Sequence, residues 1–111
     1  MLDRTSIDLL QGTLGVLILK ALSWGPMHGY GVVRWIEHIA GDELLIEEGS
    51  LYPALQKLLL KGWVKASPTI SESGRAVREY RLTPAGRKQL DFERANYRRV
   101  TSAIDAVLEG A

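Results

Sequence analysis

The sequence predicts a mainly α-helical domain that carries one two-stranded β-hairpin and ends in a long helix. Apolar residues recur at helical spacing in three short segments before residue 62. Between residues 63 and 82 the period shortens to that of a strand, around a turn rich in serine and glycine. A single helical stretch follows Thr83-Pro84. With 111 residues, of which 46% are hydrophobic, the chain can build one small core.

The first two helices are predicted over Leu9–Leu22 and Tyr30–Ala40. Gly25-Pro26 ends the first, and Gly41 caps the second. The first helix is apolar almost all round, which indicates burial on more than one side, with a partner subunit covering the second. Its apolar run is too short and too interrupted to span a bilayer, so we expect no membrane partner.

A third helix is predicted from an N-cap at Ser50 to about Lys61, with Glu47 and Glu48 at its N-terminus. Pro53 is expected near the start of the helix, where its missing N–H costs little. The apolar stripe consists of Leu51, Leu55 and Leu58. The opposite face carries Tyr52, Pro53, Gln56 and Lys57, types that suit phosphate contact and base recognition. For this segment alone, an ordinary solvated face is the alternative.

The β-hairpin is predicted from a strand beginning at Trp63, a turn over residues 71–74 and a strand over Val77–Leu82. Pro68 permits only an edge strand at its position. The cations on or near this hairpin are Lys65, Arg75, Arg78 and Arg81.

The last helix is predicted to start with Thr83 as N-cap and Pro84 at the first helical position, and to run to about Glu109. About 26 residues give a length of roughly 39 Å, more than so small a domain can cover. Apolar residues recur every seven positions, which indicates self-association rather than a helix packed back on its own domain. The predicted dimer interface consists of Leu14, Leu17, Leu90, Tyr97, Val100, Ile104 and Val107.

Charge is segregated along the chain, although the net charge is only +1. Residues 1–52 carry −4, residues 53–99 carry +7 and residues 100–111 carry −2. Such segregation is typical of a surface that meets a polyanion, while a chance excess of solvated Lys and Arg is the alternative.

The residues give little support to an enzyme. There is no cysteine, which excludes disulfides and thiolate chemistry and fits a reducing cytoplasm. His28 and His38 lack metal-site spacing and are expected to be structural or exposed, and no glycine-rich phosphate loop is present. We therefore expect no catalytic residue, no metal and no cofactor.

The predicted order is helix, helix, helix, β-hairpin, long helix, which is the layout of a winged helix-turn-helix. Residues 1–83 then form a DNA-binding domain, and residues 84–111 a C-terminal dimerisation helix. The third helix would enter the major groove, and the hairpin, or wing, would reach the flanking backbone or minor groove.

Several runs of residues resemble the PadR family of bacterial transcriptional regulators: Gly25–Gly31, Glu48–Leu55, Gly62-Trp63 and Tyr80–Gly86. The resemblance implies a homodimeric repressor of nearby genes that a small molecule or stress signal releases from double-stranded DNA. By matching position, it places Ser50, Tyr52, Pro53, Gln56 and Lys57 on the recognition helix, and Arg75 and Arg78 on the wing. Leu59 and Leu60 depart from the charged or polar residues of many relatives.

On this reading Lys57, Lys65, Arg75 and Arg78 supply most of the affinity through counterion release. Gln56 is the best candidate for direct recognition of a base, because its amide can form two hydrogen bonds with adenine. The alternative is a winged-helix module that binds protein or ligand instead of DNA. Its apolar pocket, at a dimer interface, would be lined by Trp24, Trp35, Trp63 and Tyr97. Trp24, Trp35 and Tyr97 are also the candidate effector pocket, and core packing is the other role for these aromatics.

Overall fold

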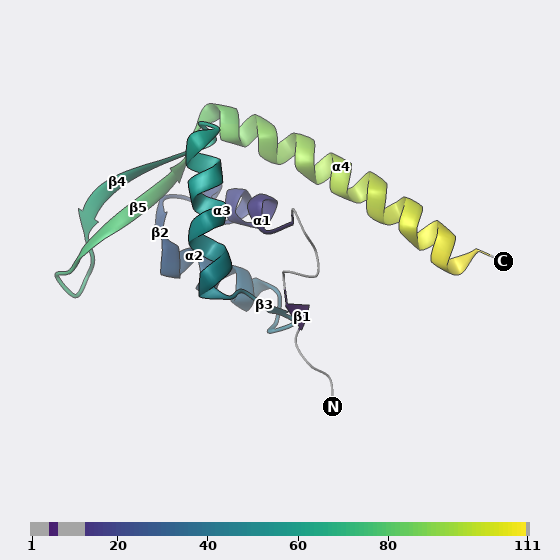
Figure 1. Ribbon diagram of the computed structural model, residues 1–111, viewed down its shortest axis with the longest axis horizontal. Coiled ribbons are helices and arrows are strands. Elements are labelled where there is room, and N and C mark those ends of the chain that lie inside the picture. The colour runs from purple at the N-terminus through teal and green to yellow at the C-terminus, as the bar shows by residue number, and fades with distance from the viewer. Residues whose placement is uncertain (1–4, 7–12, 111) are drawn as a thin grey trace.

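The computed structural model describes residues 5–6 and 13–110. Figure 1 shows the shorter helices gathered in one body, with a β-hairpin reaching out on one side and a long helix on the other. The helices are α1 (Thr13–Leu22), α2 (Gly29–Ile39), α3 (Glu48–Leu60) and α4 (Pro84–Glu109). The strands are β1 (Thr5–Ser6), β2 (Met27–His28), β3 (Leu44–Leu45), β4 (Val64–Ile70) and β5 (Ala76–Leu82). The predicted mainly helical fold with a hairpin and a long last helix is confirmed.

The predicted hairpin is the β4–β5 pair, and a short third strand that the sequence did not reveal joins it. β2 pairs antiparallel with β5, so the strand order is β2-β5-β4. Met27 pairs with Tyr80, and Val64 with Leu82. A separate parallel pair joins β1 to β3. Because β2 leads directly into α2, the sheet fixes where α2 begins.

The core lies where α1, α2 and α3 meet the base of the sheet. Ile18, Leu19 and Ala21 of α1 are fully buried, because α1 contacts α2, α3, α4 and β5. This position explains why α1 is apolar almost all round. The part of its predicted range before Thr13 lies outside the described residues. None of the four helices in the described ranges combines the length and apolar composition of a membrane-spanning helix.

The start of α3 differs from the prediction. The helix begins at Glu48, with Glu47 in the N-cap position, so Ser50 lies in the first turn and is not the N-cap. Acidic residues favour a helix N-terminus, which explains why the helix extends to Glu48. Pro53 consequently lies inside the helix, where the carbonyl of Gly49 lacks its usual N–H partner. Gly49 is exposed, so water can solvate that carbonyl.

Four residues form what we call the α3–α4 junction: Gly62, Trp63, Thr83 and Gly86. The Thr83 hydroxyl donates to the Gly62 carbonyl (2.7 Å) and accepts from the N–H of Gly86 (3.0 Å). The Thr83 N–H donates to the Trp63 carbonyl (3.1 Å). These bonds confirm Thr83 as the N-cap of α4 and tie the end of α3, both wing strands and α4 together.

Replacement of Gly86 by alanine should destabilise the protein by about 1–3 kcal/mol, because overpacking forces backbone to move. A Cβ at this position would collide with the carbonyl group of Trp63 and would lie 2.8 Å from Cδ1 of Leu82. Urea unfolding followed by circular dichroism measures the change. Gly49→Ala is the matched control: nothing lies within 4 Å of its Cβ, and it should stabilise α3 by about 0.5–1 kcal/mol. Equal stability of Gly86→Ala and wild type would contradict the junction's tight packing.

Candidate nucleic-acid interface

The exposed face of α3 carries the side chains that the sequence selected for DNA recognition. Leu51, Leu55 and Leu58 are buried against the core. The helix thereby turns its opposite face to solvent, and Ser50 on the flank is half-buried. The exposed residues of that face are Tyr52, Pro53, Gln56 and Lys57.

Tyr52 links α3 to the start of α2. Its ring lies against Gly29: a Cβ at Gly29 would be only 3.2 Å from the Tyr52 hydroxyl oxygen and 3.3 Å from Cε1. The close approach of the two helices therefore depends on a glycine at this position. About half of the Tyr52 side chain is still exposed, so its outer edge is open to solvent.

His28 has a structural role at the beginning of α2. Its Nδ1 atom accepts a hydrogen bond from the N–H of Gly31 at 3.0 Å, which makes His28 the N-cap of the helix. The prediction of a structural or exposed histidine is confirmed by this bond. In the described ranges, no group of three or more His, Cys, Asp or Glu residues is arranged to hold a metal ion.

The tip of the wing is closed by the predicted turn. Ser71 donates its N–H to the Arg75 carbonyl at 2.8 Å, and Gly74 adopts a left-handed φ of 83°. The Ser71 hydroxyl also accepts from the N–H of Arg75 at 3.2 Å. These bonds hold the exposed Arg75 at the outer end of the hairpin.

The register of the hairpin separates the two other cations chosen for the wing. Lys65 pairs with Arg81, whereas Arg78 pairs with Pro68. Cross-strand partners share a face, and the faces alternate along a strand. Arg78 lies on the face of the buried Tyr80, with its guanidinium 5.6 Å from the centre of that ring. Lys65 lies on the opposite face, so the structure does not bring Lys65 and Arg78 together.

Two exposed residues of α2 form a pair that was not predicted from the sequence. Tyr30 and Arg34 are stacked, with the guanidinium of Arg34 5.7 Å from the ring centre. They share a helical stripe with Glu37, whose Oε2 accepts from the N–H of Ile46 just before α3 (3.1 Å). The stripe therefore lies on the side of α2 that meets the segment leading into α3. The signal was the spacing of an aromatic residue and an arginine at i and i+4.

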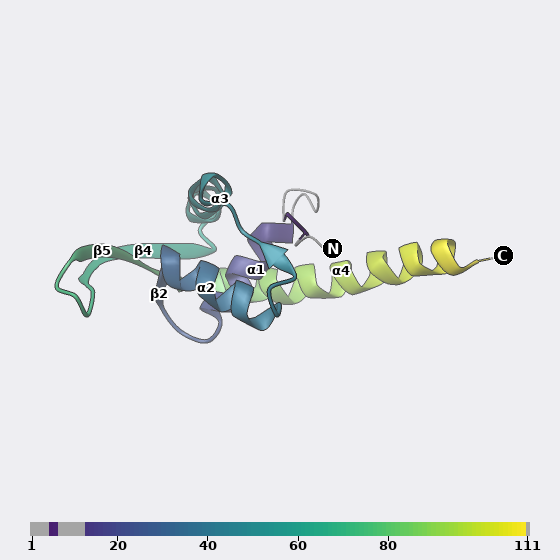
Figure 2. The same cartoon turned by 90° about the horizontal axis from the view of Figure 1, so that it is seen from below.

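The far part of α4 is covered little by its own protomer. Leu90 is an exception, because its side chain is only 3% exposed and belongs to the protomer's own core. Its assignment to the dimer interface is therefore wrong. Leu14 and Leu17 are partly buried against that core. Figure 2 shows α4 running out beyond the body. The exposed large apolar residues along this part are Tyr97, Val100, Ile104, Val107 and Leu108, and Leu108 was not among the predicted interface residues.

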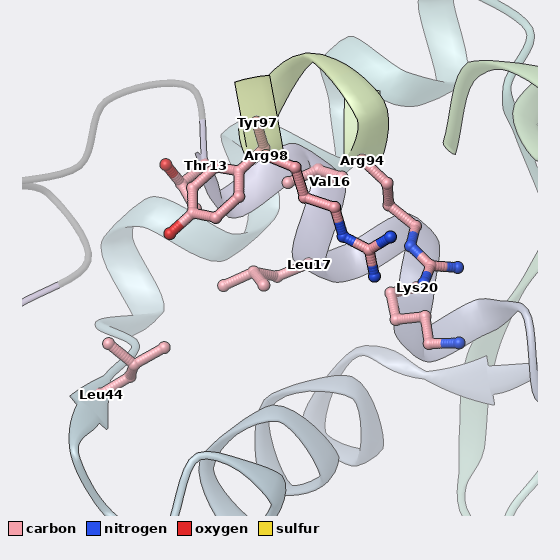
Figure 3. A pocket seen from close by; sticks show the side chains of 8 residues that line it. All are labelled: Thr13, Val16, Leu17, Lys20, Leu44, Arg94, Tyr97 and Arg98. Carbon is pink, nitrogen blue, oxygen red and sulfur yellow. The ribbon is translucent and has the colours of Figure 1, made fainter. Parts of the chain in front are cut away.

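A cavity of about 320 Å³ lies between α1, β3 and α4. Figure 3 shows Lys20, Arg94 and Arg98 gathered on one side of it, with Tyr97 and Thr13 on the other. Val16, Leu17 and Leu44 give it apolar walls. Of the aromatics predicted for an effector pocket, only Tyr97 lines this cavity. Trp24 is 70% exposed and stacks on Lys20 at the end of α1, and Trp35 is partly buried against the core.

The transcriptional regulator PadR-like family matches residues 18–92 of this chain. An uncharacterized 37.1 kDa protein in transposon TN4556 of Streptomyces fradiae is 39% identical over 89 residues. That match covers 80% of this chain, which spans 24% of the length of the relative.

Solved structures agree with the family match. A transcriptional regulator from Clostridium thermocellum has a TM-score of 0.80 and 26% identity, over 88% of this chain and 95% of that one. A PadR family transcriptional regulator from Eggerthella lenta has a TM-score of 0.78 and 27% identity, over 95% of this chain and 89% of that one. Because the family match covers residues 18–92, more than half of the chain, the chain belongs to the PadR-like family of transcriptional regulators.

Proposed function

We propose that the protein is a homodimeric repressor that binds a roughly palindromic operator and is released from it by a small molecule or stress signal. The observation that carries the DNA-binding part is the exposed row of Tyr52, Gln56 and Lys57 on α3, flanked by a wing with Arg75 at its tip. Helices of this kind read base edges from the major groove, while cations on the flanks bind phosphates.

The roles of Gln56 and Arg75 in this proposal are different. Gln56 is exposed on α3 and can pair bidentately with an adenine. Arg75 is exposed at the tip of the wing, where it contacts phosphate without reading sequence.

Gln56→Ala should relax discrimination at one base position by about 1–3 kcal/mol, whereas Arg75→Ala should weaken binding to all sequences and lower the salt slope by about one. Gel shifts with the DNA upstream of the protein's own gene, repeated over a range of salt concentrations, measure both effects. An Arg75→Ala slope equal to that of wild type would remove Arg75 from the interface. Binding that ignores ionic strength altogether would favour the alternative, a module for protein or ligand.

That alternative receives no support from the aromatic residues. Trp24, Trp35 and Trp63 do not line the cavity that Tyr97 lines. Trp24 and Trp63 instead each have a neighbouring cation over the ring, Lys20 at 5.5 Å and Lys61 at 4.8 Å from the ring centre. We therefore retain the repressor as the proposed function.

The dimer is proposed from the apolar stripe of α4. Tyr97, Ile104 and Leu108 continue the row that begins at the buried Leu90, and each of the three is about half exposed or more. A row of large apolar residues at helical spacing is typical of an interface between helices. A two-fold dimer would present two copies of α3 about one helical turn of DNA, roughly 34 Å, apart.

Ile104→Glu should raise the dimer dissociation constant at least tenfold, about 1.4 kcal/mol, because a carboxylate would be buried without a partner. Sedimentation velocity over a dilution series measures it. Ala106→Glu is the matched control, since Ala106 is exposed on the opposite side of α4. Equal dissociation constants for the two variants would contradict the proposed interface.

The cavity between α1 and α4 is the proposed effector site. Its apolar walls and its three cations, Lys20, Arg94 and Arg98, suit an amphipathic anion of small size. Since Tyr97 lines the cavity and also belongs to the proposed dimer stripe, a bound molecule would act on how the two protomers meet.

Anilinonaphthalene sulfonate, a fluorescent aromatic anion, should bind here, and the double variant Arg94→Gln and Arg98→Gln should weaken that binding about tenfold, since charge-assisted contacts are the strong ones. A fluorescence titration measures it. Arg87→Gln with Lys88→Gln, an exposed pair near the start of α4, is the control. Unchanged binding in the first double variant would contradict the site.

A further inference from the structure

The two faces of the wing differ in charge. Beyond the buried Tyr80, one face carries Pro68, Ile70, Ala76 and Arg78; we call it the arginine face. It contains no acidic residue. The opposite face carries Thr69, Val77 and Glu79, together with His28 of β2, whose partner in the register is Glu79; we call it the glutamate face.

The glutamate face is hollowed. A cavity of about 430 Å³ lies there, lined among others by His28, Glu72 and Glu79 and by the serines of the turn. Phosphate groups would meet two carboxylates on this face, and like charges at close range repel. Among the residues of the paired strands, the cations of this face are Lys65 and Arg81, which lie at the base of the hairpin. Arg75 lies in the turn at the tip, outside the paired strands, and belongs to neither face.

The arginine face is continuous with α3 through the start of α2. Met27 pairs with Tyr80 and therefore shares the face of Arg78. Two residues later Gly29 begins α2, and the ring of Tyr52 lies against it. Tyr30 and Arg34 follow in the first turns of α2, on the stripe whose Glu37 binds the segment before α3. Met27 and Gly29 thus connect the face of Arg78 with the start of α2, against which Tyr52 packs.

We propose that DNA lies against the arginine face of the wing, so that one phosphate backbone follows Arg78, the Tyr30–Arg34 pair and Tyr52, while Lys65 and the glutamate face point away from it. This inference rests on the proposed DNA-binding function and assigns its phosphate contacts. Stacking supports it, because Tyr80 and Tyr30 hold the two guanidinium groups in place before DNA arrives.

The test compares variants that remove one charge and keep a polar side chain: Arg78→Gln, Arg34→Gln and Lys65→Gln, all at exposed positions. Fluorescence anisotropy with a labelled upstream duplex of about three helical turns gives affinity against salt. Arg78→Gln and Arg34→Gln should each lower the slope of log K against log salt by about 0.9, and Lys65→Gln should leave it unchanged. Glu79→Gln should change affinity less than about twofold, because the carboxylate is turned away from the phosphates.

Three outcomes would overturn the inference: an unchanged slope in Arg78→Gln or Arg34→Gln, a slope in Lys65→Gln that falls equally, or a large gain in affinity in Glu79→Gln. Thermal unfolding of each variant is the control that tests whether the fold is intact. The proposed function fails separately, if the wild-type protein does not retain the duplex at low salt.

Discussion

The arrangement of this protein depends on the crossing of two chain segments at the α3–α4 junction. The Thr83 hydroxyl accepts a hydrogen bond from the first turn of α4 and donates one to the carbonyl of Gly62, just after α3. The crossing is so close that position 86 has no room for a side chain. One residue thereby sets the direction of three elements: the recognition helix that ends here, the wing that starts and returns here, and the long helix that leaves. The crossing acts together with the packing of α1 against α3, α4 and β5, which also holds the wing and α4 relative to α3.

The sequence predicts those elements well whose signals are local. Thr83-Pro84 marks the start of α4, and Ser71 to Gly74 mark the turn of the wing, because capping and turn formation are decided by a few adjacent residues. Gly62, with a left-handed φ of 76°, closes α3 for the same reason. The order of helices and hairpin follows from these signals, and with it the winged helix-turn-helix.

What the sequence could not supply depends on pairing between distant segments. β2 is two residues long, too short to show any periodicity, and exists only because β5 pairs with it. The separation of Lys65 from Arg78 depends on the register of the hairpin, which composition does not reveal. Leu90 fits a heptad row as well as a core position, and only the path of α4 across α1 decides between them. The α3 boundary shifted because Glu47 and Glu48 extend the helix before Ser50.

The stiffness of α4 has a consequence for signalling. A helix of 26 residues is a lever of about 39 Å, held firmly at its Pro84 end by the junction. The cavity beside α1 lies partway along it, at Arg94, Tyr97 and Arg98. If the helix moves as a rigid rod, a tilt of about 5° about its Pro84 end displaces the C-terminal end by roughly 3 Å. In the proposed dimer such a tilt would change the distance between the two copies of α3. A small molecule bound beside α1 would then move that distance away from the helical repeat of DNA.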